Sequence, residues 1–295
     1  MDYAIETNAL TKRFRKLVAV NEIELRVPYG SVYGFLGRNG AGKTTTILML
    51  LGLLRPTSGG STVLGYSTKI DSVSIRAEVG YVPEKQIMYD WMTVKEILWF
   101  TGKFYKTWNE ELANDLVQRF GLDPKRRIKH LSRGMVAELS LILALAPAPK
   151  LLILDDPTSG MDPIVRREFM EHVVDLVQDG KHTVFFSSHI LSDIERVADW
   201  VGILKDGRLL IQSEVDALKL RTRKVIAKFA AEPPRELAMG EPLWVRRDGT
   251  ALTATFSQYD DGIPEKLKSL GATTVQVLDL SLDDIFVEYL GPEKE

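Results

Sequence analysis

The chain has 295 residues, of which 45% are hydrophobic and 26% are charged, a composition typical of globular proteins. Its formal net charge of -2 provides no global attraction to nucleic acid or to anionic lipid. The absence of cysteine excludes disulfides and thiolate chemistry, and it permits a reducing compartment without proving one. The length indicates one large domain or two unequal ones.

The sequence predicts neither a signal peptide nor a membrane span. The first ten residues, MDYAIETNAL, lack the basic and apolar regions of a signal peptide. The most apolar stretch, LSLILALAPAPKLLIL, is interrupted by Pro147, Pro149 and Lys150, so it is too short and too broken to cross a bilayer. We therefore expect any membrane role to depend on a partner.

Short strand-like runs alternate with helix-like runs from residue 1 to about 220. The apolar runs predict strands at 31–37, 78–82, 151–155, 183–188 and 200–204. Continuous apolar strands of this kind are typical of parallel sheets covered on both faces. The predicted fold class is therefore α/β.

The stretch from about 85 to 150 is helical in pattern and predicts a subdomain inserted into the α/β core. Thr93 and Glu96 have the spacing of a capping box before a helix. Asn109 is the expected N-cap of a second helix, and Gly121 is its expected end.

Two other features of this subdomain have structural rather than functional interpretations. The basic run PKRRIKH at 124–130 lacks an aromatic platform, so we expect a solvated face and no nucleic-acid partner. The aromatic side chains of Trp91, Trp99 and Trp108 are expected to pack inside the subdomain.

A small second domain is predicted at 221–295, after a first domain at 1–220. The boundary follows the locally basic segment DALKLRTRK. The strand-like runs KVIAKFA, PLWVRR and ALTATF come next, followed by the helix-like IPEKLKSL, the strand-like TTVQVL and the helix-like SLDDIFVEYL. This mixture predicts an α+β accessory domain.

The segment GRNGAGKTT satisfies the phosphate-loop pattern G-x-x-x-x-G-K-[ST], also called Walker A, between a predicted strand and a predicted helix. Its glycines let backbone N–H groups face phosphates, and the helix N-terminus favours the same anion. Lys43 is expected to bridge the β- and γ-phosphates of ATP, and the Thr44 hydroxyl to bind Mg²⁺. A chance glycine-rich turn is disfavoured, because motif and context agree. The expected nucleotide-binding residues here are Gly37, Asn39, Gly40, Gly42, Lys43, Thr44 and Thr45.

The apolar strand LLILD ends in Asp155, which fits the carboxylate on the Mg²⁺ side of phosphate-loop enzymes. A carboxylate at a buried strand end is costly unless it is paired or faces a metal ion. The alternative is a surface aspartate after a core strand. The next residue, Asp156, is a candidate catalytic base or a surface residue that opens a turn.

Further segments carry a resemblance to a known family. They are TKRFRK at 11–16, GYVPEKQ at 80–86, LSRGM at 131–135, SGMD at 159–162 and SSHIL at 187–191. In order and spacing they resemble the ATPase subunit of an ATP-binding cassette (ABC) transporter, over roughly residues 4 to 215. The tail also looks like the small C-terminal extension of some drug- and antibiotic-exporting members.

The resemblance implies a phosphate-loop NTPase core with antiparallel β elements and a helical insertion. It places Phe14 where the family has an aromatic that stacks on adenine, although a lone aromatic is more often a core residue. It implies Thr44, Asp155 and Glu84 around Mg²⁺. The implied function is to bind and hydrolyse ATP and so energise a membrane transporter, here an exporter.

The resemblance also implies partners. Ser132 and Gly134, in the segment that corresponds to the family signature LSGGQ, would contact the γ-phosphate bound by a second copy or a homologous chain. His189 would contact that phosphate from its own subunit, although a lone histidine after a strand is usually structural. Membrane subunits on separate chains would dock on the helical insertion and hold this chain at the cytoplasmic face of the membrane.

Several positions depart from the family pattern. Asp156 stands where a glutamate normally polarises the attacking water, and its shorter side chain withdraws the carboxylate by roughly 1.5 Å. Glu84 replaces the usual glutamine, and Arg133 and Met135 replace a glycine and a glutamine of the signature. With Asp156, Glu84 and His189 as catalytic residues, we expect a functional but slow ATPase.

Other functions and assemblies stay open. A soluble ABC protein acting on DNA or the ribosome is disfavoured by the single phosphate loop and the lack of heptads. A nucleotide sensor with little or no hydrolysis rests on Asp156 and Glu84. A homodimer is slightly favoured over a heterodimer, because a plausible group fills every chemical role.

Overall fold

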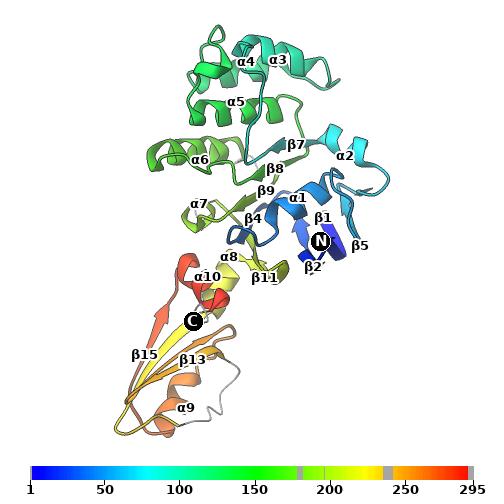
Figure 1. Cartoon of the computed structure of the whole chain (residues 1–295). Helices are drawn as coiled ribbons and strands as arrows, with labels where there is room; N and C mark the ends of the chain where they lie inside the picture. Colours follow the sequence, from blue (N-terminus) through cyan, green and yellow to red (C-terminus); the bar gives the residue numbers. More distant parts are fainter. Residues whose placement is uncertain (1, 178–181, 196, 235–241, 292–295) are drawn as a thin grey trace. The chain divides into compact units, whose positions relative to one another are not determined.

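The computed structural model describes residues 2–177, 182–195, 197–234 and 242–291 (Figure 1). The chain divides into two compact units, Met1–Gln212 and Ser213–Glu295. The predicted boundary at 220/221 is slightly late, because α8 (Val215–Arg221) lies in the second unit and contacts α10 (Leu282–Leu290) there.

The first unit is built on a six-stranded sheet of order β11-β10-β4-β9-β8-β7. The strands are β4 (Val32–Gly37), β7 (Val79–Val82), β8 (Leu151–Asp155), β9 (Thr183–Ser188), β10 (Trp200–Lys205) and β11 (Arg208–Glu214). The pairs β10–β4, β4–β9, β9–β8 and β8–β7 are parallel. All five predicted strands and the α/β class are therefore confirmed.

A second, antiparallel sheet packs on this core in the order β2-β1-β5-β6, with β3 also paired to β1. Its strands are β1 (Tyr3–Phe14), β2 (Leu17–Ile23), β3 (Arg26–Pro28), β5 (Ser58–Val63) and β6 (Tyr66–Ser67). One hydrophobic core joins both sheets through α1 (Lys43–Leu50), with fully buried Leu10, Ile47 and Phe185 among its members. The phosphate loop is thereby fixed between the two sheets.

The helical subdomain contains α3 (Val94–Gly102), α4 (Glu110–Arg119), the 3₁₀ turn Ile128–His130 and α5 (Arg133–Leu145). The other helices of this unit are α2 (Ser72–Glu78), α6 (Pro163–Val177) and α7 (Leu191–Glu195). The expected capping box at Thr93 and Glu96 is present, and the side chain of Asn109 accepts the N–H of Leu112 at 3.0 Å. Among the described helices, none combines the length and the hydropathy that a membrane crossing requires.

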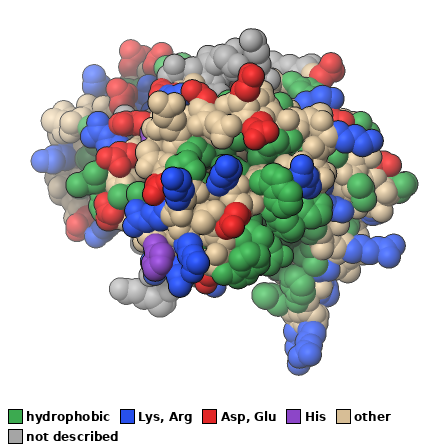
Figure 2. Space-filling model, turned by 90° about the horizontal axis from the view of Figure 1, so that it is seen from above, with side chains coloured by type: hydrophobic (Ala, Val, Ile, Leu, Met, Phe, Trp, Pro, Cys, Tyr) green, Lys and Arg blue, Asp and Glu red, His purple; other side chains and the backbone are tan. Residues whose placement is uncertain are grey.

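The expectation for the tryptophans of this subdomain is wrong at two positions. Trp91 and Trp99 are each 64% exposed, whereas Trp108 packs over Gly102, where an added Cβ would lie 3.0 Å from the indole ring. Figure 2 looks down on this end of the first unit and shows hydrophobic side chains gathered at the surface, with Lys and Arg beside them. The large apolar side chains exposed here are Ile87, Tyr89, Trp91, Trp99 and Phe104.

In its described residues the second unit is an antiparallel sheet of order β13-β14-β12-β15 with three helices. Its strands are β12 (Arg223–Phe229), β13 (Pro242–Asp248), β14 (Ala251–Phe256) and β15 (Ala272–Asp279). Its helices are α8, α9 (Ile263–Ser269) and α10. Helix α9 covers one face, where Ile263 and Leu267 pack on Val225, Ala254 and Phe256.

Candidate nucleotide-binding site

The phosphate loop connects the end of β4 to the start of α1. Gly42 has a φ of 108°, in the left-handed region that side chains rarely adopt, and a Cβ there would lie 2.4 Å from the carbonyl oxygen of Ala19. Gly40 also has a positive φ of 81°. Only glycine therefore allows the loop to curl at Gly42 and to lie against β2.

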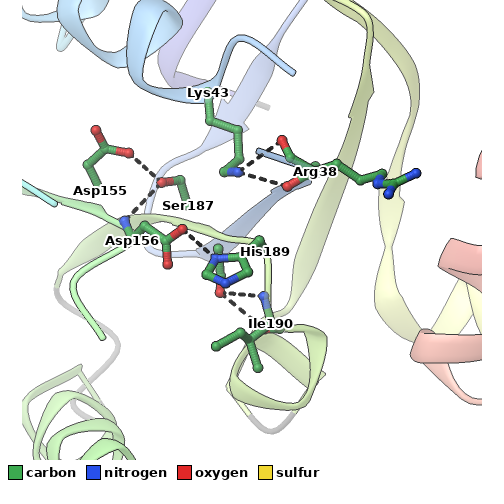
Figure 3. Close-up of polar contacts among 9 residues, drawn as sticks. Arg38, Lys43, Asp155, Asp156, Ser187, His189 and Ile190 are labelled. Carbon is green, nitrogen blue, oxygen red and sulfur yellow. Dashed lines mark hydrogen bonds and ion pairs between the residues drawn. The ribbon is translucent and has the colours of Figure 1, made fainter. Parts of the chain in front are cut away.

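Lys43 begins α1 and is held inside the loop (Figure 3). Its Nζ donates to the carbonyl oxygens of Gly37 at 2.7 Å and Arg38 at 3.4 Å. Burial lowers the pKa of Lys43, while the carboxylates of Asp156, Asp155 and then Glu84 act in the opposite direction. The side chain is thus confined to a position where its neighbours are carboxylates and backbone carbonyls.

Asp155 ends β8 and is only 1% exposed. Its Oδ1 accepts a hydrogen bond from Ser187 Oγ at 2.7 Å (Figure 3), whereas Oδ2 has no partner among the described residues. Burial raises the pKa of Asp155, and the hydroxyls of Ser187 and Thr44 oppose that shift. A buried carboxylate oxygen without a partner is expensive unless a cation is bound beside it.

Asp156 follows with a left-handed backbone, at a φ of 45°. Its N–H donates to the carbonyl oxygen of Ser187 at 3.0 Å and to Ser187 Oγ at 3.1 Å. Its Oδ2 lies 2.6 Å from His189 Nδ1, and Oδ1 has no partner among the described residues. The backbone conformation and these contacts direct the carboxyl group away from Asp155 and towards His189 (Figure 3).

A cavity of about 410 Å³ brings most of the expected site residues together. Its lining consists of Phe14, Leu17, Ala19, Asn39, Gly40, Gly42, Lys43, Thr44, Thr45, Glu84, Asp155 and Asp156. Phe14 is 44% exposed, so it is not a core residue, and Lys12 Nζ lies 5.1 Å from the centre of its ring. The aromatic and apolar wall therefore meets the phosphate loop and the carboxylates in one space.

Sequence reasoning missed three residues of this region. Leu17 and Ala19 extend the apolar wall from β2, and Ser187 connects the two aspartates from β9. The short spacing of Leu17 and Ala19 from Phe14 along the chain was an available signal. The role of Ser187 had none, because it depends on the pairing of β8 with β9.

The segment LSRGM lies outside this cavity. Ser132 caps α5 by accepting the N–H of Met135 at 3.2 Å, and a Cβ on Gly134 would lie 2.3 Å from Val165 Cγ1. Arg133 donates to the carbonyl oxygen of Gly160 at 3.4 Å and lines a second cavity of about 460 Å³, which Glu84 also borders. The contact of Ser132 and Gly134 with a nucleotide held by another chain stays a prediction.

The residues of the main cavity fit Mg²⁺ bound together with a nucleotide. Among the described residues, no cluster of three His, Cys, Asp or Glu side chains could hold a metal ion by itself. Mg²⁺ commonly takes one or two protein carboxylates and completes its shell with phosphate oxygens and water. The partnerless Oδ2 of Asp155 matches that requirement, and the Thr44 hydroxyl acts on the same carboxyl group.

The fold and the site define a phosphate-loop nucleotide-binding protein. The family model described as ABC transporter matches residues 20–159. The bacitracin transport ATP-binding protein BcrA of Bacillus licheniformis is 33% identical, over 99% of this chain and 98% of its own length. The daunorubicin/doxorubicin resistance ATP-binding protein DrrA of Streptomyces peucetius is also 33% identical, over 98% of this chain and 92% of its own length.

A solved ATP-binding subunit of an ABC transporter is 26% identical, with a TM-score of 0.66, over 74% of this chain and 92% of that one. The chain belongs to the family of ABC transporter ATP-binding proteins. It is an ATPase subunit of a membrane transporter, as the sequence motifs predicted. Subunits of this family work with membrane subunits.

Proposed function

We propose that the chain energises an exporter of drug- or antibiotic-like substrates. The relatives named for bacitracin and for daunorubicin/doxorubicin match it over 99% and 98% of its length, so their similarity includes the C-terminal unit. ATP hydrolysis is supported chiefly by the cavity that joins the phosphate loop to Asp155 and Asp156. The substrate itself would contact membrane subunits rather than this chain.

In the proposed mechanism, the nucleotide lies along the main cavity with adenine on Phe14 and phosphates at Lys43. Thr44 and Asp155 would hold Mg²⁺, with Glu84 at the same cavity wall. The ion, when bound, offsets phosphate charge and orients the γ-phosphate. Asp156 would position and activate the attacking water through its partnerless Oδ1, while His189 fixes Oδ2.

The proposed working form is a dimer with two nucleotides between its chains. Ser132 and Gly134 lie at the N-terminus of α5, outside the cavity of their own chain. From a second chain they would bring backbone N–H groups and the helix dipole to the γ-phosphate. ATP binding would close the dimer, and hydrolysis would open it. A homodimer needs no additional chain to supply a missing group.

Docking to membrane subunits is proposed for the helical subdomain. Its surface exposes Trp91, Trp99 and Phe104 at 64%, 64% and 71%. Large exposed apolar groups are typical of protein interaction sites. Through such partners the chain would sit at the cytoplasmic face of the membrane.

Slow turnover is part of the proposal. The side chain of Asp156 is one methylene shorter than that of glutamate, and a misplacement near 1 Å can cost about a hundredfold in rate. The contact with His189, at 2.6 Å, further restricts where the carboxylate can move. A second candidate, a nucleotide-binding regulator with little or no hydrolysis, rests on the same departure and on Glu84.

Phosphate release by the purified full chain with ATP and Mg²⁺ tests the function. We expect release by the wild type and a loss of about a hundredfold or more in Asp156→Asn, with ATP binding retained. Asp248→Asn is the matched control, because it changes an exposed aspartate of the other unit. ATP binding by the wild type without phosphate release would instead establish the regulator.

A further inference from the structure

The two edges of the sheet in the C-terminal unit differ in how well they are protected against pairing with another strand. The edge strand β13 begins with Pro242, has an irregular register near Trp244, and carries Arg246 and Arg247. Arg247 also donates to the carbonyl oxygen of Pro234, which places chain beside that edge. Proline, charge and irregular pairing are the usual means by which proteins prevent edge strands from joining others.

Within the described residues the opposite edge, β15, has fewer of these protections: its register shift with β12 lies between Ala272 and Thr274, at the start of the strand. Its sequence ATTVQVLD has no proline and no charge before Asp279. From Thr274 to Asp279 it pairs with β12 in regular register. Among the strands that the structure describes, β15 pairs with β12 on one side and with none on the other, and Figure 1 shows it at the outer edge of this sheet. Its outer row of backbone N–H and C=O groups is therefore available for another strand.

The side chains of β15 also suit a partner strand. Val275 and Val277 pack on the core of the unit but are only partly buried. Because side chains alternate along a strand, Thr274, Gln276 and Leu278 lie on the other face. A strand placed beside β15 would cover the exposed parts of both valines.

We propose that β15 pairs antiparallel with β15 of a second copy of this chain. The matching register is centred on Gln276, so that Val275 lies opposite the second copy's Val277. Thr274 then lies opposite Leu278, and the charged Asp279 lies opposite Thr273. This two-fold arrangement keeps the two valine-bearing faces on one side of a continuous sheet and places no like charges together.

A second copy is the occupant that this edge fits best. A neutral strand whose apolar positions match themselves about a two-fold axis needs no other sequence as its partner. If the chain forms the nucleotide-bound dimer of the proposed function, tethering raises the effective concentration of the two C-terminal units to the order of millimolar. Pairing through β15 also operates without nucleotide, because none of its residues lies at the nucleotide cavity.

Disulfide formation by Gln276→Cys in the full chain tests the register. The chain has no cysteine, so the introduced thiol has no competitor. Directly opposed residues of antiparallel strands have Cα atoms about 4.5–5.5 Å apart. That range lies within the roughly 4.4–6.8 Å of disulfides. Under mild oxidation we expect covalent dimers on non-reducing gels, formed at least tenfold faster than with Thr250→Cys, an exposed position in the β13–β14 turn.

A second test of the pairing places a charge on β15. Thr274→Lys, added to Gln276→Cys, should slow crosslinking at least tenfold. Thr250→Lys, added to Gln276→Cys in the same way, should leave the crosslinking rate unchanged. Circular dichroism of each variant verifies that the fold is intact. Crosslinking of Gln276→Cys at the Thr250→Cys rate, with and without ATP and Mg²⁺, would overturn the pairing even if ATP hydrolysis is normal. Fast crosslinking without nucleotide supports the pairing even in a chain that does not hydrolyse ATP.

Discussion

Buried carboxylates in the two units differ in how completely they are hydrogen-bonded. In the C-terminal unit, Glu288 is 7% exposed and both of its oxygens are bonded: Oε1 lies 3.0 Å from Lys224 Nζ, and Oε2 accepts from Thr255 Oγ1 at 2.8 Å. In the first unit, Asp155 and Asp156 are 1% and 5% exposed, and each leaves one oxygen without a partner among the described residues.

This difference indicates that Glu288 has a structural role and that Asp155 and Asp156 bind a ligand. A buried carboxylate with a cation and a hydroxyl around it is complete within the fold. Two adjacent buried carboxylates with open oxygens lower stability unless something else binds there. Such sites are where functional chemistry is commonly found. The ligand chemistry therefore belongs to the ends of β8 and β9, and Glu288 has a scaffolding role.

The largest stability effect is expected from Glu288→Ala. The substitution leaves the Lys224 ammonium, now 27% exposed, without its carboxylate, and it also removes the acceptor of Thr255. We expect a loss of about 3 kcal/mol in the free energy of unfolding of the C-terminal unit, measured by urea denaturation. Glu265→Ala, at an exposed position of α9, is the control. Equal losses of unfolding free energy in the two variants would contradict a scaffolding role for Glu288.

A smaller effect, on the site itself, is expected from Ser187→Ala. The hydroxyl donates to Asp155 and accepts from the N–H of Asp156. Its removal takes the hydrogen bond from Asp155 Oδ1, while the N–H of Asp156 keeps the carbonyl oxygen of Ser187. We expect the gain in ATP affinity on adding Mg²⁺ to fall about tenfold, or roughly 1.4 kcal/mol. Titration calorimetry with and without Mg²⁺ measures it, and affinity without Mg²⁺ should not change.

The control for Ser187→Ala is Ser61→Ala. It also removes a buried hydroxyl, one that is bonded to Thr68 Oγ1 at 2.7 Å in the antiparallel sheet. If both variants lose the Mg²⁺-dependent gain alike, the effect reflects general loosening of the fold and not the positioning of Asp155 and Asp156.

The smallest effect is a pH dependence from Glu138 on α5. Burial and the neighbouring Glu168 raise the pKa of Glu138 to about 7, from 4.5. Because the folded state binds this proton more tightly, its contribution to stability is full below pH 4.5 and is lost as pH rises to about 7. Glu138→Gln should remove that loss and raise the melting temperature by a few degrees at pH 8.

Thermal unfolding at pH 8 and pH 4 checks this expectation. His172 Nδ1 lies 3.7 Å from the Glu138 carboxylate, and burial lowers the pKa of His172, which disfavours the folded state below about pH 6.5. The contribution of His172 to stability therefore increases with pH, whereas that of Glu138 decreases. Glu110→Gln, at an exposed position of α4, should change neither melting temperature. An unaltered melting temperature of Glu138→Gln at pH 8 would contradict the pKa shift.

The sequence predicted the features that depend on neighbouring residues. The apolar run LLILD, the capping box at Thr93 and the glycine spacing around Lys43 are local patterns, and each forms the expected element. These patterns suffice for the parallel sheet and for the phosphate loop. Asp156 was also placed near the chemistry by its position after β8.

Features that depend on distant pairing were not predictable in the same way. Leu17 and Ala19 reach the cavity only because the antiparallel sheet lies beside the phosphate loop. Ser187 joins the aspartates only because β9 pairs with β8. The exposure of Trp91 and Trp99 was mistaken for burial, since aromatic side chains serve both cores and interaction surfaces.

The most direct test of the central claim is the rate of ATP hydrolysis by Asp156→Glu with saturating ATP and Mg²⁺. If Asp156 acts on the attacking water with a side chain that is too short, the added methylene should raise phosphate release about tenfold, within the limit that a 1 Å correction permits. A rate equal to or below that of the wild type would contradict the assignment of slow turnover to the reach of Asp156.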